Sequence, residues 1–224
     1  MTSHQCHTAG SSPWLAGWYQ RAFAWLLFRG ISRYDRAVAD RKRVLFSDLH
    51  GDVLEIGPGT GINLSYYPIG IRWIGIEPNL FMYPYLKKEA KKLHFDIDLR
   101  SGSAEQLEIQ DSTIDVVVST LVLCSVNNPK RVLQEILRVL KPGGRFLLME
   151  HVAAPLGTWL RRVQCWLRPV WRVVVDGCCP DRETLTVIES AGFDCISCQH
   201  FRAPLPIVGP HVAGVAIKRP HWVE

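Results

Sequence analysis

The sequence predicts an α/β fold, a doubly wound and mostly parallel sheet of seven strands preceded by N-terminal helices. Short apolar runs alternate with amphipathic segments from residue 52 to residue 150, as is typical of parallel strands covered by helices on both faces. A glycine-rich turn follows the first of these runs. After residue 192, two apolar runs follow each other without a helix between them, which indicates a final hairpin with a reversed last strand.

The expected strands are short and rich in apolar and β-branched residues. They are placed at residues 52–56, 72–76, 95–99, 114–119, 144–150, 193–201 and 211–218. Asn79 and Asn128 have side chains typical of helix N-caps and are expected to begin the helices that follow them. A further helix is expected at about 181–191, and Gly143 and Gly144 are expected to form the left-handed turn that leads into the fifth strand.

The composition excludes several classes of protein. The net charge of +5 is modest and its Lys and Arg residues are spread along the chain, so nucleic acid is not an expected partner. Seven cysteines, an odd number that includes adjacent Cys178 and Cys179, indicate reduced thiols in a cytoplasmic compartment. No metal site is expected, because the Cys-x-x-Cys at 195–198 lacks a second pair and the histidines and cysteine of residues 4–7 lie in a polar terminus.

The most informative segment is residues 53–61, an apolar run followed by glycines at positions 57, 59 and 61. Such glycines either form a tight structural turn or let the backbone approach a ligand where a Cβ would clash. Glu77 ends the next apolar run, where a carboxylate can accept hydrogen bonds from a ribose diol. The spacing Gly-x-Gly-x-Gly departs from that of dinucleotide sites, and Glu55 would repel a diphosphate but suit a cation. We therefore expect S-adenosylmethionine, which has a ribose diol, an amino group and a sulfonium.

These residues resemble the cofactor motifs of the class I S-adenosylmethionine-dependent methyltransferases, over residues 48–218. The resemblance implies a Rossmann-like seven-stranded sheet and S-adenosylmethionine as cofactor. Residues 55–61 look like the cofactor loop of that group, residues 102–107 like its adenine-side turn and residues 115–119 like its fourth strand. The cofactor-binding residues that it implies are Glu55, Gly57, Pro58, Gly59, Gly61, Glu77, Pro78, Ser103, Ala104, Glu105, Thr120 and Leu121.

Segments outside the cofactor motifs are similar to the methyltransferase-like thiol S-methyltransferases, whose animal members are membrane-associated. They comprise residues 43–49, 120–126, 149–154, 176–178, 182–183, 203–205, 210–211 and Gly214. Similarity in so many separate places is more specific than a glycine loop alone. It implies S-methylation of a small thiol or of hydrogen sulfide.

The domain organisation follows from length and pattern, since 224 residues suit one well-buried domain. The N-terminal region is expected to combine a disordered tail with two helices, and an aromatic stretch in it either lids the active site or lies on a membrane surface. A later segment rich in Trp and Arg is expected to cover the substrate. The N-terminal region comprises residues 1–47, with its tail at 1–12, its helices at 14–28 and 31–47, and the aromatic stretch at 14–28. The methyltransferase domain comprises residues 48–218 and contains the cover at 155–175. The protein is expected to be cytoplasmic or peripheral at a membrane.

The expected chemistry makes few demands on side chains, because methyl transfer from a sulfonium needs alignment, a desolvated site and a deprotonated nucleophile. A thiol with a pKa of about 8.5 is already partly ionised at neutral pH. His151, Asp176 and His211 are the candidates for assisting deprotonation, and each has a structural alternative, as a hydrogen-bonded histidine or a turn residue. Cys124 is expected to line the site as a buried, protonated thiol.

Two other functions stay open on the sequence. O- or N-methylation of a lipophilic small molecule, such as a quinone or lipid precursor, would suit the Trp-rich and basic cover at residues 155–175. The other is a cofactor-binding membrane adaptor without catalysis. A small molecule is the expected partner of the enzyme, and the sequence does not indicate an oligomeric state.

Overall fold

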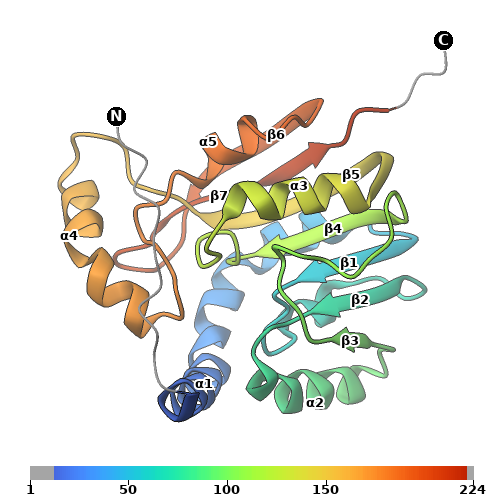
Figure 1. Ribbon diagram of the computed structural model, residues 1–224, viewed down its shortest axis with the longest axis horizontal. Coiled ribbons are helices and arrows are strands. Elements are labelled where there is room, and N and C mark those ends of the chain that lie inside the picture. The colour runs from blue at the N-terminus through green and yellow to red at the C-terminus, as the bar shows by residue number, and fades with distance from the viewer. Residues whose placement is uncertain (1–12, 221–224) are drawn as a thin grey trace.

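A seven-stranded sheet forms the centre of the computed structural model, which describes residues 13–220 (Figure 1). The strand order is β3-β2-β1-β4-β5-β7-β6. All neighbouring strands are parallel except that β7 runs antiparallel to both β5 and β6. The strands are β1 (Asp52–Ile56), β2 (Arg72–Ile76), β3 (Asp98–Arg100), β4 (Ile114–Thr120), β5 (Leu140–His151), β6 (Cys195–Arg202) and β7 (Pro210–Ile217). The predicted doubly wound sheet with a reversed last strand is confirmed.

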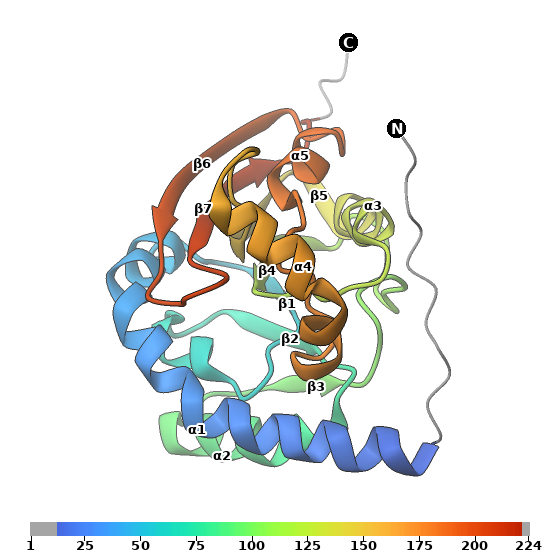
Figure 2. The ribbon, with the colours of Figure 1, turned by 90° about the vertical axis from the view of Figure 1, so that its left-hand side faces the viewer.

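Helices cover both faces of this sheet (Figures 1 and 2). One face packs against α3 and α5, and the other packs against α2 and the C-terminal end of α1. The helices are α1 (Pro13–Phe46), α2 (Tyr83–Leu93), α3 (Pro129–Val139), α4 (Trp159–Val174) and α5 (Thr184–Glu189), with short 3-10 turns η1 (Ile62–Tyr66) and η2 (Leu80–Met82). The predicted tail at residues 1–12 and the histidines and cysteine of residues 4–7 lie outside the described residues.

Alternation of side chains along the central strands builds two separate cores. Val53 of β1 packs with α1 and α2, whereas its neighbour Leu54 packs with α3 and α5. Val116 and Val117 of β4 divide in the same way. Because successive side chains of a strand point to opposite faces, a strand buried on both faces needs an unbroken apolar run. The unbroken apolar runs in the sequence are therefore explained by strands that are buried on both faces.

The N-terminal helices differ from the prediction, because α1 is a single helix of 34 residues rather than two. The predicted break fell beside Gly30, which costs a helix about 1 kcal/mol relative to Ala. Buried Ala24 on one side and buried Tyr34 and Val38 on the other fix both halves against the domain. Tertiary packing thus outweighs the local weakness.

The predicted helix caps at Asn79 and Asn128 are confirmed, since their side chains accept hydrogen bonds from the amides of Phe81 and Arg131. Asn79 begins the 3-10 turn η2, and α2 follows directly. The turn before the fifth strand is only partly as predicted. Gly143 has a positive φ of 76°, but Gly144 does not, and β5 already begins at Leu140.

Three smaller boundary predictions were also wrong. The strand predicted at 144–150 spans 140–151, because a register shift between β4 and β5 places residues 141–144 in an irregular part of the strand. The third strand lies at 98–100 instead of 95–99, because α2 ends in a left-handed turn at His94 and the chain needs further residues to reach the sheet edge. The predicted helix at 181–191 is shorter, at 184–189.

Candidate active site

The glycine loop and Glu77 lie together at the carboxyl ends of β1 and β2. Gly57, Gly59 and Gly61 all have positive φ, between 55° and 81°. A Cβ at Gly61 would lie 3.2 Å from the Cα of Leu86, so this glycine also permits close packing of the loop against α2. The Gly59 amide donates a hydrogen bond to Glu77 Oε2 at 3.0 Å, and the Asn79 amide donates one to Oε1 at 2.8 Å.

Glu77 is 6% exposed, and this burial raises the pKa of its carboxyl to about 7, against the two amides that lower it. The negative charges of Asp176 and Glu55 raise it further. Its neighbour Pro78 is exposed, whereas Pro58 in the glycine loop is buried and its carbonyl accepts a hydrogen bond from Gly61 N at 3.0 Å.

Glu55 lies behind the loop as a buried carboxylate with partners of its own. Its Oε1 accepts a hydrogen bond from Asn63 Nδ2 at 2.7 Å, and its Oε2 accepts one from Trp73 Nε1 at 3.0 Å. Asn63 Nδ2 also donates to Thr120 Oγ1 at 3.1 Å, while Asn63 Oδ1 is buried without a hydrogen-bond partner among the described residues. A direct contact of Glu55 with a ligand therefore stays a prediction, and Asn63 is the group that presents an unused acceptor.

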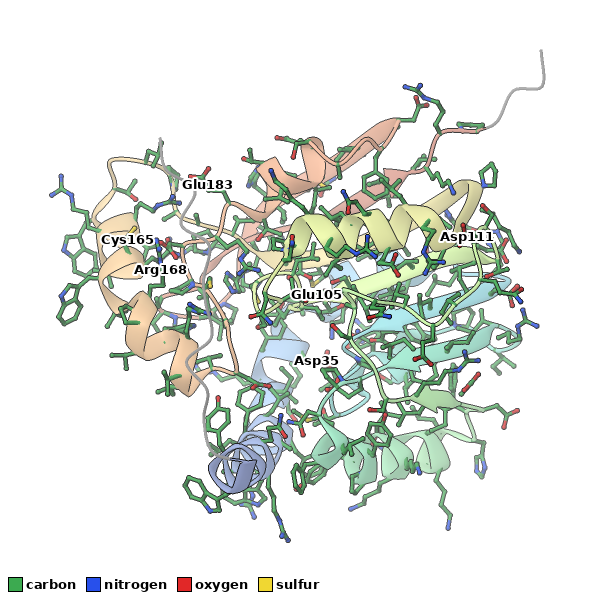
Figure 3. All side chains as sticks on the ribbon, viewed as in Figure 1. Asp35, Glu105, Asp111, Cys165, Arg168 and Glu183 are labelled. Atoms are coloured by element: carbon green, nitrogen blue, oxygen red, sulfur yellow. The ribbon has the colours of Figure 1, made fainter. Side chains whose placement is uncertain are left out.

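The turn after β3 borders a hollow of about 200 Å³ at the carboxyl ends of β2 and β3. It is lined by Ile76, Arg100, Ser101, Gly102, Ser103, Gln106 and Glu108. Ser103 Oγ accepts a hydrogen bond from the Glu105 amide at 3.2 Å, which shapes the turn. Ala104 packs on the core, and Glu105 accepts a hydrogen bond from Asn128 N at the start of α3 (Figure 3). Of the three residues predicted in this turn, only Ser103 lines the hollow.

Leu121 follows β4 with a φ of 59°, an unusual conformation for a side chain of its size. Its amide donates to Met149 O at 3.0 Å, which holds the backbone between β4 and β5. Strained positions of this kind persist where the surroundings determine them, and they cluster at functional sites. Thr120 and Leu121 thus lie at the sheet edge where parallel α/β folds bind ligands.

The N-terminal half of α1 lies over the glycine loop (Figure 2). A Cβ at Gly59 would lie 3.8 Å from Leu27 Cδ2, and Asn79 Nδ2 donates to the Gln20 carbonyl at 3.2 Å. Tyr19 accepts a hydrogen bond from the Asp176 amide at 2.7 Å. These contacts agree with the lid role that was one of the two alternatives for this stretch.

Asp176 sits in a left-handed turn, with a φ of 42°. Burial raises the pKa of its carboxyl, and its charge acts on Glu77 and Tyr19. The geometry supports the turn alternative for Asp176, since among the described residues no hydrogen bond joins its carboxylate to a histidine.

The two histidines predicted as catalytic face each other across β5 and β7, where His151 and His211 are paired in register with ring centroids 6.3 Å apart. His211 Nδ1 lies 2.9 Å from the Gly209 carbonyl, so this nitrogen carries the proton and Nε2 is left with a lone pair. That Nε2 is buried without a partner among the described residues, as is the Tyr34 hydroxyl, whose ring centroid lies 5.6 Å from His211. Burial lowers the pKa of His211 to about 4, so its ring is neutral.

His151 belongs to a second group, because its Nε2 lies 3.0 Å from Cys178 Sγ. Cys124 completes this group, and all three side chains are buried. The hydrogen bond from Cys178 and the nearby His151 hold the pKa of the Cys124 thiol well below its usual value. The prediction of a buried Cys124 is confirmed. Its Sγ also lies 3.4 Å from the Leu121 carbonyl, and its protonated form stays a prediction.

Comparison with known proteins assigns the chain to a family. Residues 54–148 match the methyltransferase domain family. The human thiol S-methyltransferase TMT1A is 40% identical over 209 residues, which cover 88% of this chain and 86% of that protein. The human thiol S-methyltransferase TMT1B is 38% identical over 211 residues, with the same coverage. The chain belongs to the thiol S-methyltransferase family.

The fold of this methyltransferase is also that of solved relatives. A structure from Thermotoga maritima, described as a SAM-dependent methyltransferase and possible histamine N-methyltransferase, has a TM-score of 0.67 at 20% identity. The similarity covers 90% of this chain and 99% of that one. The family and fold implied by the sequence motifs are confirmed.

The predicted substrate cover of the methyltransferase is a helix with its polar face turned inward. Gln164 of α4 is fully buried, and its side chain accepts a hydrogen bond from Ala154 N and donates one to the Ile207 carbonyl. Arg168 forms an ion pair with Asp181 (Figure 3). Trp159 and Trp166 point outward and are 75% and 80% exposed. Within the segment expected to cover the substrate, these two tryptophans therefore do not pack on the domain, whereas Trp171 directs its Nε1 inward to Cys178 Sγ. An amphipathic pattern shows that a helix has two faces, but it does not say which face meets the domain.

Sequence reasoning missed several residues that build the site, and they share one property. Tyr34, Asn63, Trp73 and Glu150 are polar side chains buried among apolar neighbours. Glu150 Oε1 accepts hydrogen bonds from Ser119 Oγ at 2.6 Å and Val122 N at 3.1 Å. The available signal was a charged residue inside the strongly apolar run of the fifth strand.

Proposed function

We propose that this methyltransferase binds S-adenosylmethionine at the glycine loop and transfers the methyl group to a small thiol. The two human relatives named thiol S-methyltransferases support the class of acceptor. The observation that carries the proposal is the buried, neutral His211 with an unused Nε2 at the carboxyl end of the sheet. Such an atom suits an S–H donor.

The cofactor fits the polar groups in order along the sheet edge. Glu77 would accept hydrogen bonds from the ribose diol, and the hollow beside Ser103 would take the adenine. Asn63 Oδ1 would accept from the amino group of the methionine part. The sulfonium needs no base of its own, since the methyl group leaves it without a proton transfer.

The acceptor thiol would place its sulfur near the backbone of Leu121, with His211 as the acceptor of its hydrogen bond. The S–H bond donates to Nε2, which turns a sulfur lone pair toward the methyl carbon. As the sulfur attacks the methyl carbon, its proton would move to Nε2 and from there to solvent. The bond between methyl carbon and sulfonium breaks, and the bonding pair stays on the sulfur of S-adenosylhomocysteine. The Tyr34 ring packs beside the same histidine, with ring centroids 5.6 Å apart, and this contact would restrict the position of the acceptor.

Release of S-adenosylhomocysteine in the presence of alkyl thiols, phenols and amines tests the acceptor. We expect turnover with thiols. A His211→Ala variant should lower kcat with thiols at least tenfold, because a positioned proton acceptor contributes roughly 10² or more to the rate. His200→Ala on β6 is the matched control, since His200 is exposed and should leave the rate unchanged. Turnover of phenols or amines but not thiols would show that the acceptor belongs to another class.

We further propose that the enzyme is a cytoplasmic protein that contacts membranes peripherally. Two exposed apolar faces support this, one on α4 with Trp159, Trp166 and Val170, and one on α1 with Trp18 and Trp25. The hydrogen bond between Asp176 N and Tyr19 joins α1 to the turn that follows α4. Exposed aromatic patches of this kind suit the headgroup boundary of a bilayer, and arginines beside them suit lipid phosphates. Within residues 13–220, no helix is both long enough and apolar enough to cross a membrane.

Flotation with vesicles that contain anionic lipid tests the membrane contact. The protein should float with the vesicles, and the double variant Trp159→Ser, Trp166→Ser should reduce the bound fraction several-fold. Ile69→Ser is the control, because Ile69 is fully exposed on a turn remote from both helices in the sequence. Equal flotation of the double variant and the control would show that α4 does not contribute to the membrane contact.

A further inference from the structure

Cys124, His151 and Cys178 bring three metal-binding atoms together inside the protein. Cys124 follows β4, His151 ends β5, and Cys178 lies in the loop after α4. Their two Sγ atoms and the imidazole nitrogen all lie within 4.8 Å of one another. Each side chain is at most 4% exposed. Three separate segments of the chain therefore converge on one buried point.

We propose that Cys124, His151 and Cys178 bind a zinc ion, and that its open fourth position takes the sulfur of the acceptor thiol. Two thiolates and one imidazole form a ligand set that catalytic zinc sites use, with the fourth position left to water or substrate. Soft sulfur ligands favour Zn²⁺ over Mg²⁺, Ca²⁺ or Mn²⁺. The binding of the ion stands independently, whereas the role of its fourth position rests on the proposed function.

The backbone around the cluster is held in place before it binds anything else. Arg182 Nη1 donates to the carbonyls of Leu123 and Val126 at 2.6 and 2.7 Å. Cys179 N donates to the Cys124 carbonyl at 2.9 Å. These bonds fasten the segment after β4 to the segment that contains Cys178. The sulfur atoms therefore need little rearrangement to share an ion.

Hydrogen-bond donors also surround the sulfur atoms. Trp171 Nε1 donates to Cys178 Sγ at 3.3 Å, and the Ser125 hydroxyl lies 3.5 Å from Cys124 Sγ. Outer groups of this kind orient the ligands of metal sites and tune the bound ion. A pair of thiols that only filled space would need no indole N–H directed at one of them. Among residues 13–220, Trp171 is also the one tryptophan of α4 whose ring nitrogen donates a hydrogen bond inside the protein.

The ion would supply what the thiol reaction needs most, an ionised acceptor at neutral pH. Binding to Zn²⁺ lowers the pKa of a thiol, so R–SH loses its proton to solvent and binds as R–S⁻. The thiolate sulfur attacks the methyl carbon, and the pair of the broken bond remains on the sulfur of the departing cofactor. The neutral thioether product is a weak ligand and leaves the ion.

Cobalt substitution tests the site without any measurement of turnover. The full-length protein, stripped with a chelator under reducing conditions, should bind about one equivalent of Co²⁺ with a thiolate charge-transfer band and the visible bands of tetrahedral cobalt. Cys178→Ser and His151→Ala should each weaken binding at least tenfold, in line with the roughly 10- to 100-fold losses known for metal-site changes. Cys179→Ser is the matched control, because Cys179 is equally buried but lies outside the set.

The thermal midpoint of each variant separates loss of the site from loss of the fold. Addition of 2-mercaptoethanol to the cobalt form should shift the visible bands, and dimethyl sulfide should not. Equal Co²⁺ affinity in the wild-type protein and Cys178→Ser would overturn the metal site, even if thiols are still methylated. Cobalt bands that depend on the cysteines but do not shift when 2-mercaptoethanol is added would overturn the proposal that the fourth position binds the acceptor.

Discussion

The Gly59 amide donates a 3.0 Å hydrogen bond to the Glu77 carboxylate, so the cofactor loop and the acid that ends β2 form one unit. Replacing Glu77 by Ala should weaken S-adenosylmethionine binding about 10- to 100-fold, because hydrogen bonds to a charged group are worth roughly 1.5–3 kcal/mol. Calorimetric titration measures the change. Glu89→Ala is the control, since Glu89 lies on α2 in an exposed pair with Lys92. An unchanged affinity in Glu77→Ala would show that the ribose binds elsewhere.

The affinity for S-adenosylmethionine should depend on pH through the same carboxyl. Burial raises the pKa of Glu77 to about 7, and the cofactor needs the ionised form as hydrogen-bond acceptor. Below pH 7 a proton must first leave, so the apparent Kd should be about tenfold higher at pH 6 than at pH 8. Glu77→Gln, which cannot ionise, should flatten this dependence. A wild-type Kd that is constant from pH 6 to pH 8 would contradict the assignment.

The protein's stability should respond to the same shift with the opposite sense. Because the pKa of Glu77 is higher in the folded protein than the usual 4.5, the folded state binds this proton more tightly than the unfolded chain. The stabilisation that comes from this tighter proton binding is complete below about pH 4.5 and is lost as the pH rises through 7. Glu77→Gln should therefore raise the thermal midpoint of the ligand-free protein at pH 8 and have less effect at pH 5.

The glycine loop offers a test that separates backbone strain from steric contact. Gly61→Ala should lower the free energy of unfolding by roughly 1–3 kcal/mol more than Gly70→Ala, since added bulk in packed regions costs about that much. Both glycines have positive φ, but a Cβ at Gly61 would meet Leu86, whereas the space around Gly70 is open. Urea unfolding of the two variants measures the difference. Equal losses would mean that Leu86 moves aside without cost.

The stability of the protein should depend on a buried ion pair within α1. Lys42 is fully buried and its Nζ lies 2.6 Å from Asp35 Oδ1, whose other oxygen accepts a hydrogen bond from Tyr66 at 2.7 Å (Figure 3). Asp35→Ala should cost roughly 3–5 kcal/mol, because it leaves a buried cation unpaired. Adding Lys42→Met should restore much of the loss. Asp40→Ala, which breaks an exposed pair, should cost at most about 1 kcal/mol.

Much of the fold followed from the sequence because its signals are local. Five of the seven strands lie within about two residues of their predicted places at both ends, since a strand buried on both faces requires an apolar run in its own segment. The positive φ of Gly57 and Gly59 likewise follows from the type of turn they form. The continuity of α1 through Gly30 did not follow, because packing at distant residues decides it.

The site was less accessible to prediction because its groups meet only in the folded chain. Glu55 and Trp73 lie on neighbouring strands, and their hydrogen bond depends on the register of β1 with β2. His151 and Cys178 come from segments that no local pattern connects. A histidine in a strand and a cysteine in a loop each have ordinary structural roles when considered singly. Only their distance distinguishes a cluster from two separate residues.

The unbroken length of α1 makes cofactor exchange and surface contact mutually dependent. The 34 residues of α1 follow a helical path of roughly 50 Å, which bends partway along (Figure 2). One side of its first half covers Gly59 with Leu27, and the other side carries Trp18 and Trp25 outward. A surface that binds those tryptophans therefore also restricts the motion of the part of α1 that covers the cofactor site. By thermodynamic reciprocity, a bound cofactor that favours one position of the helix must then alter the affinity for that surface by the same factor.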